Sequence, residues 1–266
     1  MTNVYIIEKW YKKLEFPQKY DEEFYRALHK ISVPMSATID SYTFSDEASI
    51  DNLLAILYLC EEVSLRYKEL NIPEDILVAT LKDIVVWTNT YTVTNNRLCL
   101  GECFWLESHL NLQIFRIGRL QYRIGQSVHN VPEYNYVEGV DVLEIHIPED
   151  GKLDIEDCKK SIASAKEFFA KYFPHYTYKY MTCNAWLLDT NLKKYLDKES
   201  NILRFADMFE VIYEFEADDI LKRIFPWDTN RENLHEKIPT TSLARRVKEG
   251  VLKGDVFHVS LGVLKQ

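Results

Sequence analysis

The sequence predicts an α+β protein in which a helical N-terminal domain (residues 1–112) precedes a mixed, mainly antiparallel sheet flanked by helices (residues 113–266). Apolar residues in the first part recur at three- and four-residue spacing, as on one face of an amphipathic helix. Near residue 113 this spacing gives way to alternation, which is typical of a half-buried strand. Strand-like and helix-like segments then follow one another to the end of the chain. These observations together favour two domains of different secondary structure.

The composition supports a packed globular protein. Apolar residues make up 47% of the 266 positions, with 17 Tyr and 13 Phe, which provides a sizeable core and argues against a mainly disordered chain. The formal net charge of −9 repels phosphate backbones, so nucleic acid is not an expected partner. With 8 Gly in the chain, a glycine-rich phosphate loop is not expected either.

Helical spacing and capping residues define the elements of the first domain. Phe24, Leu28 and Ile31 share one helix face, and Asp46 or Ser49 is expected to cap the long helix that follows. Pro73 suits the first turn of a further helix. The expected helices cover residues 21–31, about 50–70, 73–91 and 101–110.

Strands dominate the second domain. In QIFRIGRLQYRI (113–124), Leu120, Tyr122 and Ile124 occupy one face of a strand, and the opposite face carries Arg119, Gln121 and Arg123. VDVLEIHI (140–147) is close enough to form an antiparallel pair with it. The further expected elements are a helix over 154–172, a strand over 177–188, a helix over 192–209 with a break and N-cap near Ser200, a strand over 210–217, a helix over 242–252 and a strand over 254–264.

The stretch LEIHIPEDGKLD (143–154) contains the most informative polar pair. Glu144 and His146 are two residues apart on a strand and therefore lie on the same face. Either can act as a general base. The other interpretation is a structural network, in which the pair bonds to Arg119, Gln121 or Arg123 on the neighbouring strand.

The cysteines indicate a reducing compartment. Their number, 5, is odd and none form CxxC, so we expect reduced thiols in a cytoplasmic protein with no metal site. Cys183 lies within a strand and is interpreted as a small buried hydrophobe, because a nucleophile would need a base beside it. No segment approaches the roughly 20 apolar residues of a membrane span, so no membrane partner is expected. The oligomeric state cannot be predicted.

The order of elements in the second half, β-β-α-β-α-β-(α)-β, resembles the core of the GNAT acyltransferase fold. A closer resemblance is to a group of bacterial GNAT-like acyltransferase-domain proteins, which pair a helical N-terminal domain with a divergent GNAT-like C-terminal domain. The segments that carry the resemblance, with the helical first half, span most of the chain: FRIGRLQY (115–122), HIPEDGKL (146–153), SIASAKEFFAKYF (161–173), CNAWLL (183–188) and SNILRF (200–205).

This resemblance implies transfer of an acyl group from acetyl-CoA or another acyl-CoA to an amine of a small molecule or peptide. It implies that Glu144 or His146 is the catalytic base. It also implies two sets of binding residues, namely Ile147, Gly151, Lys152 and Leu153 for acyl-CoA, and Arg119, Gln121, Asn184 and Trp186 for the substrate.

The turn IPEDGKLD departs from the family pattern. It has one glycine and two acids where the family holds a pyrophosphate with glycine-rich backbone and a helix N-terminus. Lys152 and the N–H groups around Gly151 and Leu153 would still serve. The alternative is therefore a non-catalytic module that binds a small ligand or a protein on the same fold.

Overall fold

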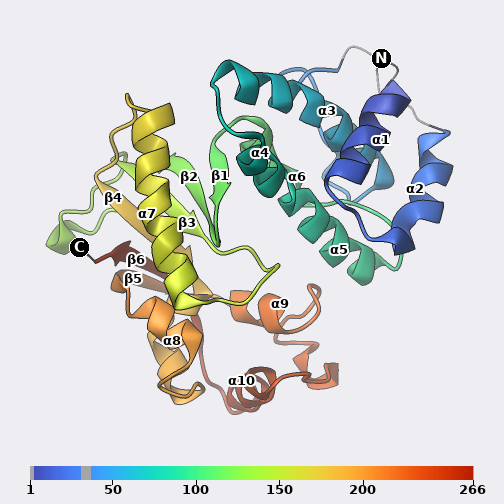
Figure 1. Cartoon of the computed structure of the whole chain (residues 1–266). Coiled ribbons are helices and arrows are strands. Elements are labelled where there is room, and N and C mark those ends of the chain that lie inside the picture. Colours follow the sequence, from blue (N-terminus) through green and yellow to red (C-terminus); the bar gives the residue numbers. More distant parts are fainter. Residues whose placement is uncertain (1–2, 31–36, 266) are drawn as a thin grey trace. The chain divides into compact units, whose positions relative to one another are not determined.

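The computed structural model describes residues 3–30 and 37–265 (Figure 1). The chain divides into two compact units, Met1–Ile117 with Pro148–Asp150, and Gly118–Ile147 with Gly151–Gln266. Ile31, which we expected on the face of the helix over residues 21–31, lies outside the described residues. The domain boundary at residues 112 and 113 stays a prediction.

Helices form most of the first unit. Ser49 caps the longest of them, because its side chain accepts a hydrogen bond from Asn52 N, and this confirms one of the two expected caps. Trp10 donates from Nε1 to Glu61 at 2.9 Å and so joins the first helix to the longest one. The elements are α1 (Asn3–Lys13), η1 (Gln18–Tyr20), α2 (Asp21–Leu28), α3 (Ile50–Glu69), α4 (Glu74–Leu81), α5 (Asp83–Asn95), α6 (Cys103–Leu110) and β1 (Ile114–Ile117).

The expectation of one helix over residues 73–91 was wrong, because α4 and α5 are separate helices that meet at Lys82. The residue directly after this break, Asp83, makes a buried polar contact. The carboxylate of Asp83 lies 2.9 Å from Trp105 Nε1 and 3.2 Å from His109 Nε2. The side chains of Asp83 and His109 are both buried. This tertiary contact has no signature in the local sequence.

A six-stranded sheet has the order β1-β2-β3-β4-β6-β5. The pair β3–β4 is parallel, whereas β2–β3, β4–β6 and β5–β6 are antiparallel, so the sheet is mixed and mainly antiparallel as predicted. The strands of the second unit are β2 (Leu120–Gln126), β3 (Asp141–His146), β4 (Tyr180–Ala185), β5 (Phe209–Glu216) and β6 (His258–Leu264).

The single strand expected over residues 113–124 was also wrong. Gly118 has φ +64°, a backbone conformation that favours glycine, and the chain turns there between β1 and β2. A Cβ atom at position 118 would lie 3.5 Å from the Ser161 Cβ, which is ordinary van der Waals contact, so the backbone conformation and not a lack of space favours glycine at this turn. The expected antiparallel pairing of the next strand, β2, with β3 is confirmed.

Helix α7 (Ile155–Tyr172) crosses one face of the sheet (Figure 1). Its buried Ser161 hydroxyl lies 2.9 Å from the Tyr122 hydroxyl and accepts a hydrogen bond from Leu120 N at 3.2 Å. The remaining elements are η2 (Pro132–Tyr134), η3 (Trp186–Leu188), η4 (Thr190–Lys194), α8 (Asn201–Ala206), α9 (Asp219–Ile224), η5 (Leu234–Glu236) and α10 (Ser242–Leu252). Ser200 caps α8 through Leu203 N, which confirms the predicted break and cap.

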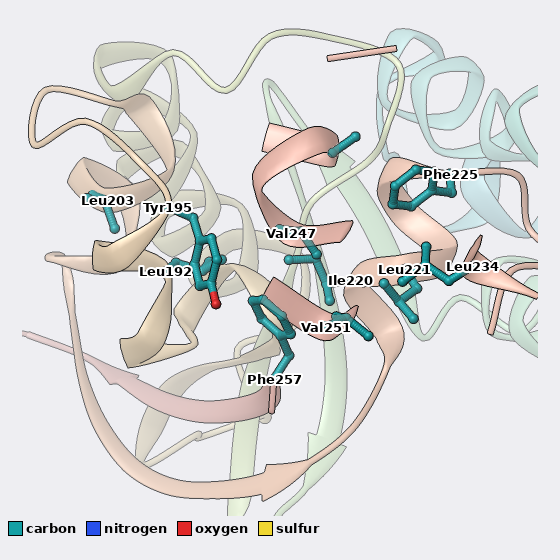
Figure 2. Close-up of a cluster of buried hydrophobic side chains, with 11 residues drawn as sticks. Leu192, Tyr195, Leu203, Ile220, Leu221, Phe225, Leu234, Val247, Val251 and Phe257 are labelled. Carbon is teal, nitrogen blue, oxygen red and sulfur yellow. The ribbon is translucent and has the colours of Figure 1, made fainter. Parts of the chain in front are cut away.

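The segment after β4 has a hydrophobic core of its own (Figure 2). Side chains from η4, α8, α9 and α10 meet there around Phe257, which precedes β6. The buried members are Leu192, Tyr195, Leu203, Ile220, Leu221, Phe225, Leu234, Ala244, Val247, Val251 and Phe257. Within the described residues, no helix has the length and hydropathy of a membrane span.

Candidate active site

The carboxyl ends of the parallel strands β3 and β4 define the candidate site. Their register joins Val142, Leu143 and Glu144 to residues 180–182 and ends at the pair Glu144–Thr182. Both strands continue beyond that pair, β3 to His146 and β4 to Ala185. The last residues of β3 are therefore paired with β2 on one side but lie outside the described β3–β4 register.

Glu144 lies at the centre of a polar network on this sheet face. Its Oε2 atom accepts a hydrogen bond from Arg123 Nε at 2.8 Å and forms an ion pair with Arg123 Nη2 at 2.7 Å. His146 Nε2 lies 3.3 Å from the same oxygen. The antiparallel register places Arg123 opposite Glu144 and Gln121 opposite His146. The structure thus brings the two predicted catalytic residues together and adds Arg123 to them.

The network keeps Glu144 ionised. Burial alone would raise the pKa of Glu144, but the hydrogen bond with His146 and the positive charge of Arg123 outweigh it and hold the pKa below the ordinary value. Gly125 leaves room for the carboxylate, since a Cβ atom at that position would lie 2.7 Å from Glu144 Oε1. Glycine within a strand often marks such a close approach, so Gly125 was a signal that our sequence analysis did not use.

The charge of Glu144 acts on three further ionisable side chains, which stay protonated near neutral pH. Burial is the main cause that raises the pKa of Tyr136 and of Tyr176, each to about 12. Burial also raises the pKa of the Cys183 thiol, which is fully buried. A thiol in this setting is a poor nucleophile, which agrees with its interpretation as a buried hydrophobe.

The turn after β3 is organised by arginine side chains. Arg119 donates from Nε to the carbonyl of Lys152 at 2.7 Å and from a terminal amino group to the carbonyl of Gly151 at 2.8 Å. In a trans peptide the carbonyl and the next N–H point in opposite directions. The N–H groups of Lys152 and Leu153 consequently point away from Arg119. Asp150 is neutralised by an ion pair with Arg116.

The N-terminus of α7 already holds a carboxylate. The Asp154 side chain accepts hydrogen bonds from Glu156 N at 2.9 Å and from Asp157 N at 3.1 Å. With two more acidic side chains in the first turn, this end of the helix opposes a second anion. An anionic ligand of the turn would therefore meet the N–H groups that precede α7.

The predicted substrate residues do not form one cluster. Arg119 is engaged by the turn carbonyls, Gln121 is buried, and Asn184 is exposed on β4 opposite Leu261. Trp186 was expected within a strand on the Asn184 face, but β4 ends at Ala185 and Trp186 begins η3. It packs against the core cluster of Figure 2. Ile147 directly follows β3.

A bound metal has no evident place at this site. Among residues 3–30 and 37–265, no group of three or more His, Cys, Asp and Glu side chains has an arrangement that could hold a metal ion.

Two sequence profiles match the chain. The profile described as "N-acyltransferase N-terminal domain" matches residues 7–112, and the profile described as "GNAT-like C-terminal domain" matches residues 114–264. A search of curated proteins finds no match. The expected pairing of a helical N-terminal domain with a GNAT-like domain is thereby confirmed.

Several solved structures have a similar fold. An acyltransferase in complex with decanoyl-CoA is 21% identical with a TM-score of 0.77, and the match covers 97% of this chain and 86% of that one. An acyltransferase in complex with decanoyl-CoA and teicoplanin is 24% identical with a TM-score of 0.72, over 81% of this chain and 66% of that one. An acyltransferase mutant in complex with octanoyl-CoA is 23% identical with a TM-score of 0.72, and the match covers 81% of this chain and 66% of that one. This chain thus spans just under two thirds of the length of the latter two proteins.

Proposed function

Because this chain belongs to the family that shares the GNAT-like C-terminal domain, we propose that it transfers an acyl group from acyl-CoA to an amine of a small molecule or peptide. The observation that carries the proposal is the polar pair Glu144–His146 at the end of β3, where the described pairing with β4 stops. In the fold family a base on this strand would lie beside the thioester and the amine, which supports the proposal.

The solved relatives suggest which ligands to test. They were crystallised with octanoyl-CoA, with decanoyl-CoA, and with decanoyl-CoA together with the glycopeptide teicoplanin. We therefore propose a medium-length acyl chain and an amine acceptor for this chain as well.

The turn after β3 would bind the phosphates of acyl-CoA. The N–H groups of Lys152 and Leu153 point away from Arg119, and the Lys152 side chain is exposed. Neutralisation of Asp150 by Arg116 removes one of the two opposing charges of this turn. Gly151 and Ile147 complete the proposed binding segment.

Acyl transfer then needs little more from the protein. The amine nitrogen attacks the thioester carbonyl, a base at Glu144–His146 removes its proton, and the thiolate of CoA departs with the C–S electron pair. Proximity of the two bound reactants supplies a large part of the rate enhancement. The buried Tyr136 hydroxyl remains protonated near neutral pH, because burial raises its pKa to about 12.

The second candidate function is a non-catalytic binding module on the same fold. It is favoured by the N-terminus of α7, where Asp154 already takes the N–H groups of Glu156 and Asp157. A site that has lost its phosphate contacts would keep the fold without binding CoA.

Thermal unfolding separates the two functions. Acetyl-, octanoyl- and decanoyl-CoA should each be added at millimolar concentration, and binding to the folded state should raise Tm. Lys152→Met should weaken that binding by roughly three- to tenfold, since a partly exposed charge–phosphate contact is lost. Lys166→Met, which removes an exposed lysine of α7 further along the helix, is the matched control. No Tm shift with any of the three acyl-CoAs would exclude the transferase and leave the binding module.

A further inference from the structure

Strand β5 is an open edge of the sheet. It is the last strand in the order β1-β2-β3-β4-β6-β5, and among the described residues it pairs with β6 alone. A bulge between Val211 and Tyr213 interrupts this pairing, and beyond it all four residues of YEFE (213–216) are exposed. The outward backbone N–H and C=O groups of this end of the strand are therefore open to a further strand.

Aromatic rings gather beside this open end. Tyr213 and Phe215 are 41% and 36% exposed, and their ring centroids are 6.2 Å apart. The ring of His129, from the connection between β2 and β3, lies 4.8 Å from that of Tyr213 and 6.5 Å from that of Phe215. These three side chains, called the aromatic cluster below, give one face of the edge a contiguous aromatic surface.

The alternate positions of the same strand end are acidic. Glu214 and Glu216 belong to the opposite face of β5, since side chains alternate along a strand. Glu214 accepts hydrogen bonds from the hydroxyls of Thr190 at 3.2 Å and Ser260 at 2.9 Å, which are both neutral. Neither glutamate forms an ion pair with a described residue, and the strand contains no Lys or Arg. This face of the edge consequently keeps its negative charge.

The two faces together specify the strand that fits the edge. The side chains of an added strand lie next to those of β5, so one of its faces meets the aromatic cluster and the other meets the two carboxylates. A second copy of this chain fits poorly, because each β5 carries three glutamates and no basic residue. A segment in which Lys or Arg alternates with apolar residues matches both faces.

We propose that the edge of β5 binds an extended segment of another protein, in which basic residues alternate with aromatic or aliphatic ones. Backbone hydrogen bonds to residues 213–216 supply affinity, and the alternating side chains supply selectivity. The basic side chains lie beside Glu214 and Glu216, and the apolar ones pack on the aromatic cluster. Since β4 and β6 separate this edge from the strand that carries Glu144, the interaction does not depend on the proposed acyl transfer.

Capped hexapeptides test the pattern on the full-length protein. A peptide of alternating Lys and Val should shift the NMR signals of the amides of residues 213–216 and slow their hydrogen exchange. An alternating Glu–Val peptide should bind at least roughly tenfold more weakly, as should a peptide with the same Lys and Val content in two blocks. Methylation of every backbone nitrogen of the Lys–Val peptide should also weaken binding by at least about tenfold, because its hydrogen-bond donors are lost.

Two substitutions test the two faces, each with a matched control. Glu216→Lys should weaken binding of the Lys–Val peptide by roughly fivefold, and Phe215→Ser should do so by roughly five- to tenfold. Glu167→Lys makes the same charge change at an exposed position of α7, and Phe104→Ser removes a ring of α6 that is 86% exposed. Both controls should leave the affinity within about twofold of the wild type, and all four variants should keep the wild-type Tm.

The outcomes distinguish the partner from its alternatives. Protection of the β5 amides by the Lys–Val peptide that is reduced in Glu216→Lys and in Phe215→Ser is the expected result. The proposal is wrong if this peptide does not bind at millimolar concentration, or if the blocked, acidic or methylated peptide binds equally well. Analytical ultracentrifugation covers the remaining occupant, since a dimer that Phe215→Ser dissociates would assign the edge to a second copy and overturn the proposed partner.

Discussion

Replacement of Gly125 by alanine should displace the carboxylate of Glu144 and leave the sheet intact. A Cβ atom at position 125 would lie 2.7 Å from Glu144 Oε1, whereas ordinary contact begins at 3.4 Å, so the oxygen must move by about 0.7 Å, the difference of the two. His146 Nε2 is already 3.3 Å from Oε2, near the limit of a hydrogen bond, so a rotation of the carboxylate that moves its oxygens by this amount is enough to break the contact.

The size of the effect follows from the exposure of the lost contact. A hydrogen bond to a charged group contributes about 1.5–3 kcal/mol. Because the Glu144 side chain is 19% exposed, the lower value applies, and about 1.5 kcal/mol corresponds to a roughly tenfold loss of kcat/KM. Alanine also restricts the unfolded chain, which offsets part of any loss of stability by about 0.4–1 kcal/mol. We therefore expect reduced turnover with an unfolding free energy within about 1 kcal/mol of the wild type.

Steady-state kinetics and urea unfolding of Gly125→Ala measure the two quantities. The same substitution in a Glu144→Ala background is the control, because the displaced carboxylate is absent there and no further loss of residual activity is expected. An equal fractional loss of kcat/KM in both backgrounds would show that Gly125 does not act through Glu144. An unchanged kcat/KM in the Gly125→Ala single variant would refute the idea that the space left by Gly125 is needed to position the Glu144 carboxylate.

Three stability predictions concern buried contacts. His109→Phe leaves the buried carboxylate of Asp83 without its imidazole partner and should lower the unfolding free energy by about 3 kcal/mol in urea titrations; a loss below about 0.5 kcal/mol would mean that the pair is not coupled. Ser161→Ala leaves the buried Tyr122 hydroxyl without its partner and should cost about 2 kcal/mol by the same measurement, with an unchanged Tm as the contrary result. Since the folded-state pKa of Glu144 lies below its ordinary 4.5, its contribution is fully present above pH 4.5 and is lost as the pH falls through the lower folded-state value. Urea unfolding between pH 3 and 6 should therefore show a shallower decline in Glu144→Gln than in the wild type.

Helix ends could be predicted where a side chain caps them, and not where a tertiary contact sets them. Ser49 and Ser200 were both identified from sequence and both accept the expected backbone hydrogen bond. The break at Lys82 was not predicted, because apolar spacing continues across it. In the structure, its φ of −60° and ψ of −16° also stay close to helical values. The contact that accompanies this break, from Asp83 to His109, joins positions 26 residues apart in the sequence.

The candidate site was predictable in the part that depends on strand alternation. The same-face placement of Glu144 and His146 follows from a period of two and is present in the structure. The choice of Arg123 over Arg119 and Gln121 as the main partner depends on register, which the connection between β2 and β3 sets. Arg119 directly precedes β2, and Gln121 and Arg123 lie on it. A shift of register by two residues would therefore have changed the partner of Glu144, and the sequence alone does not distinguish these pairings.

Whether the acidic turn after β3 can accept a phosphate depends on what each of its carboxylates contacts, and not on how many there are. Asp150 is neutralised by Arg116 and Asp154 caps α7, so neither carboxylate needs to occupy the space in front of the Lys152 and Leu153 N–H groups. The price is that the first-turn N–H groups of α7 are no longer available to a phosphate. A pyrophosphate bound here would rely on the turn itself and on Lys152 rather than on the helix dipole, and its contribution to acyl-CoA affinity should depend strongly on salt concentration.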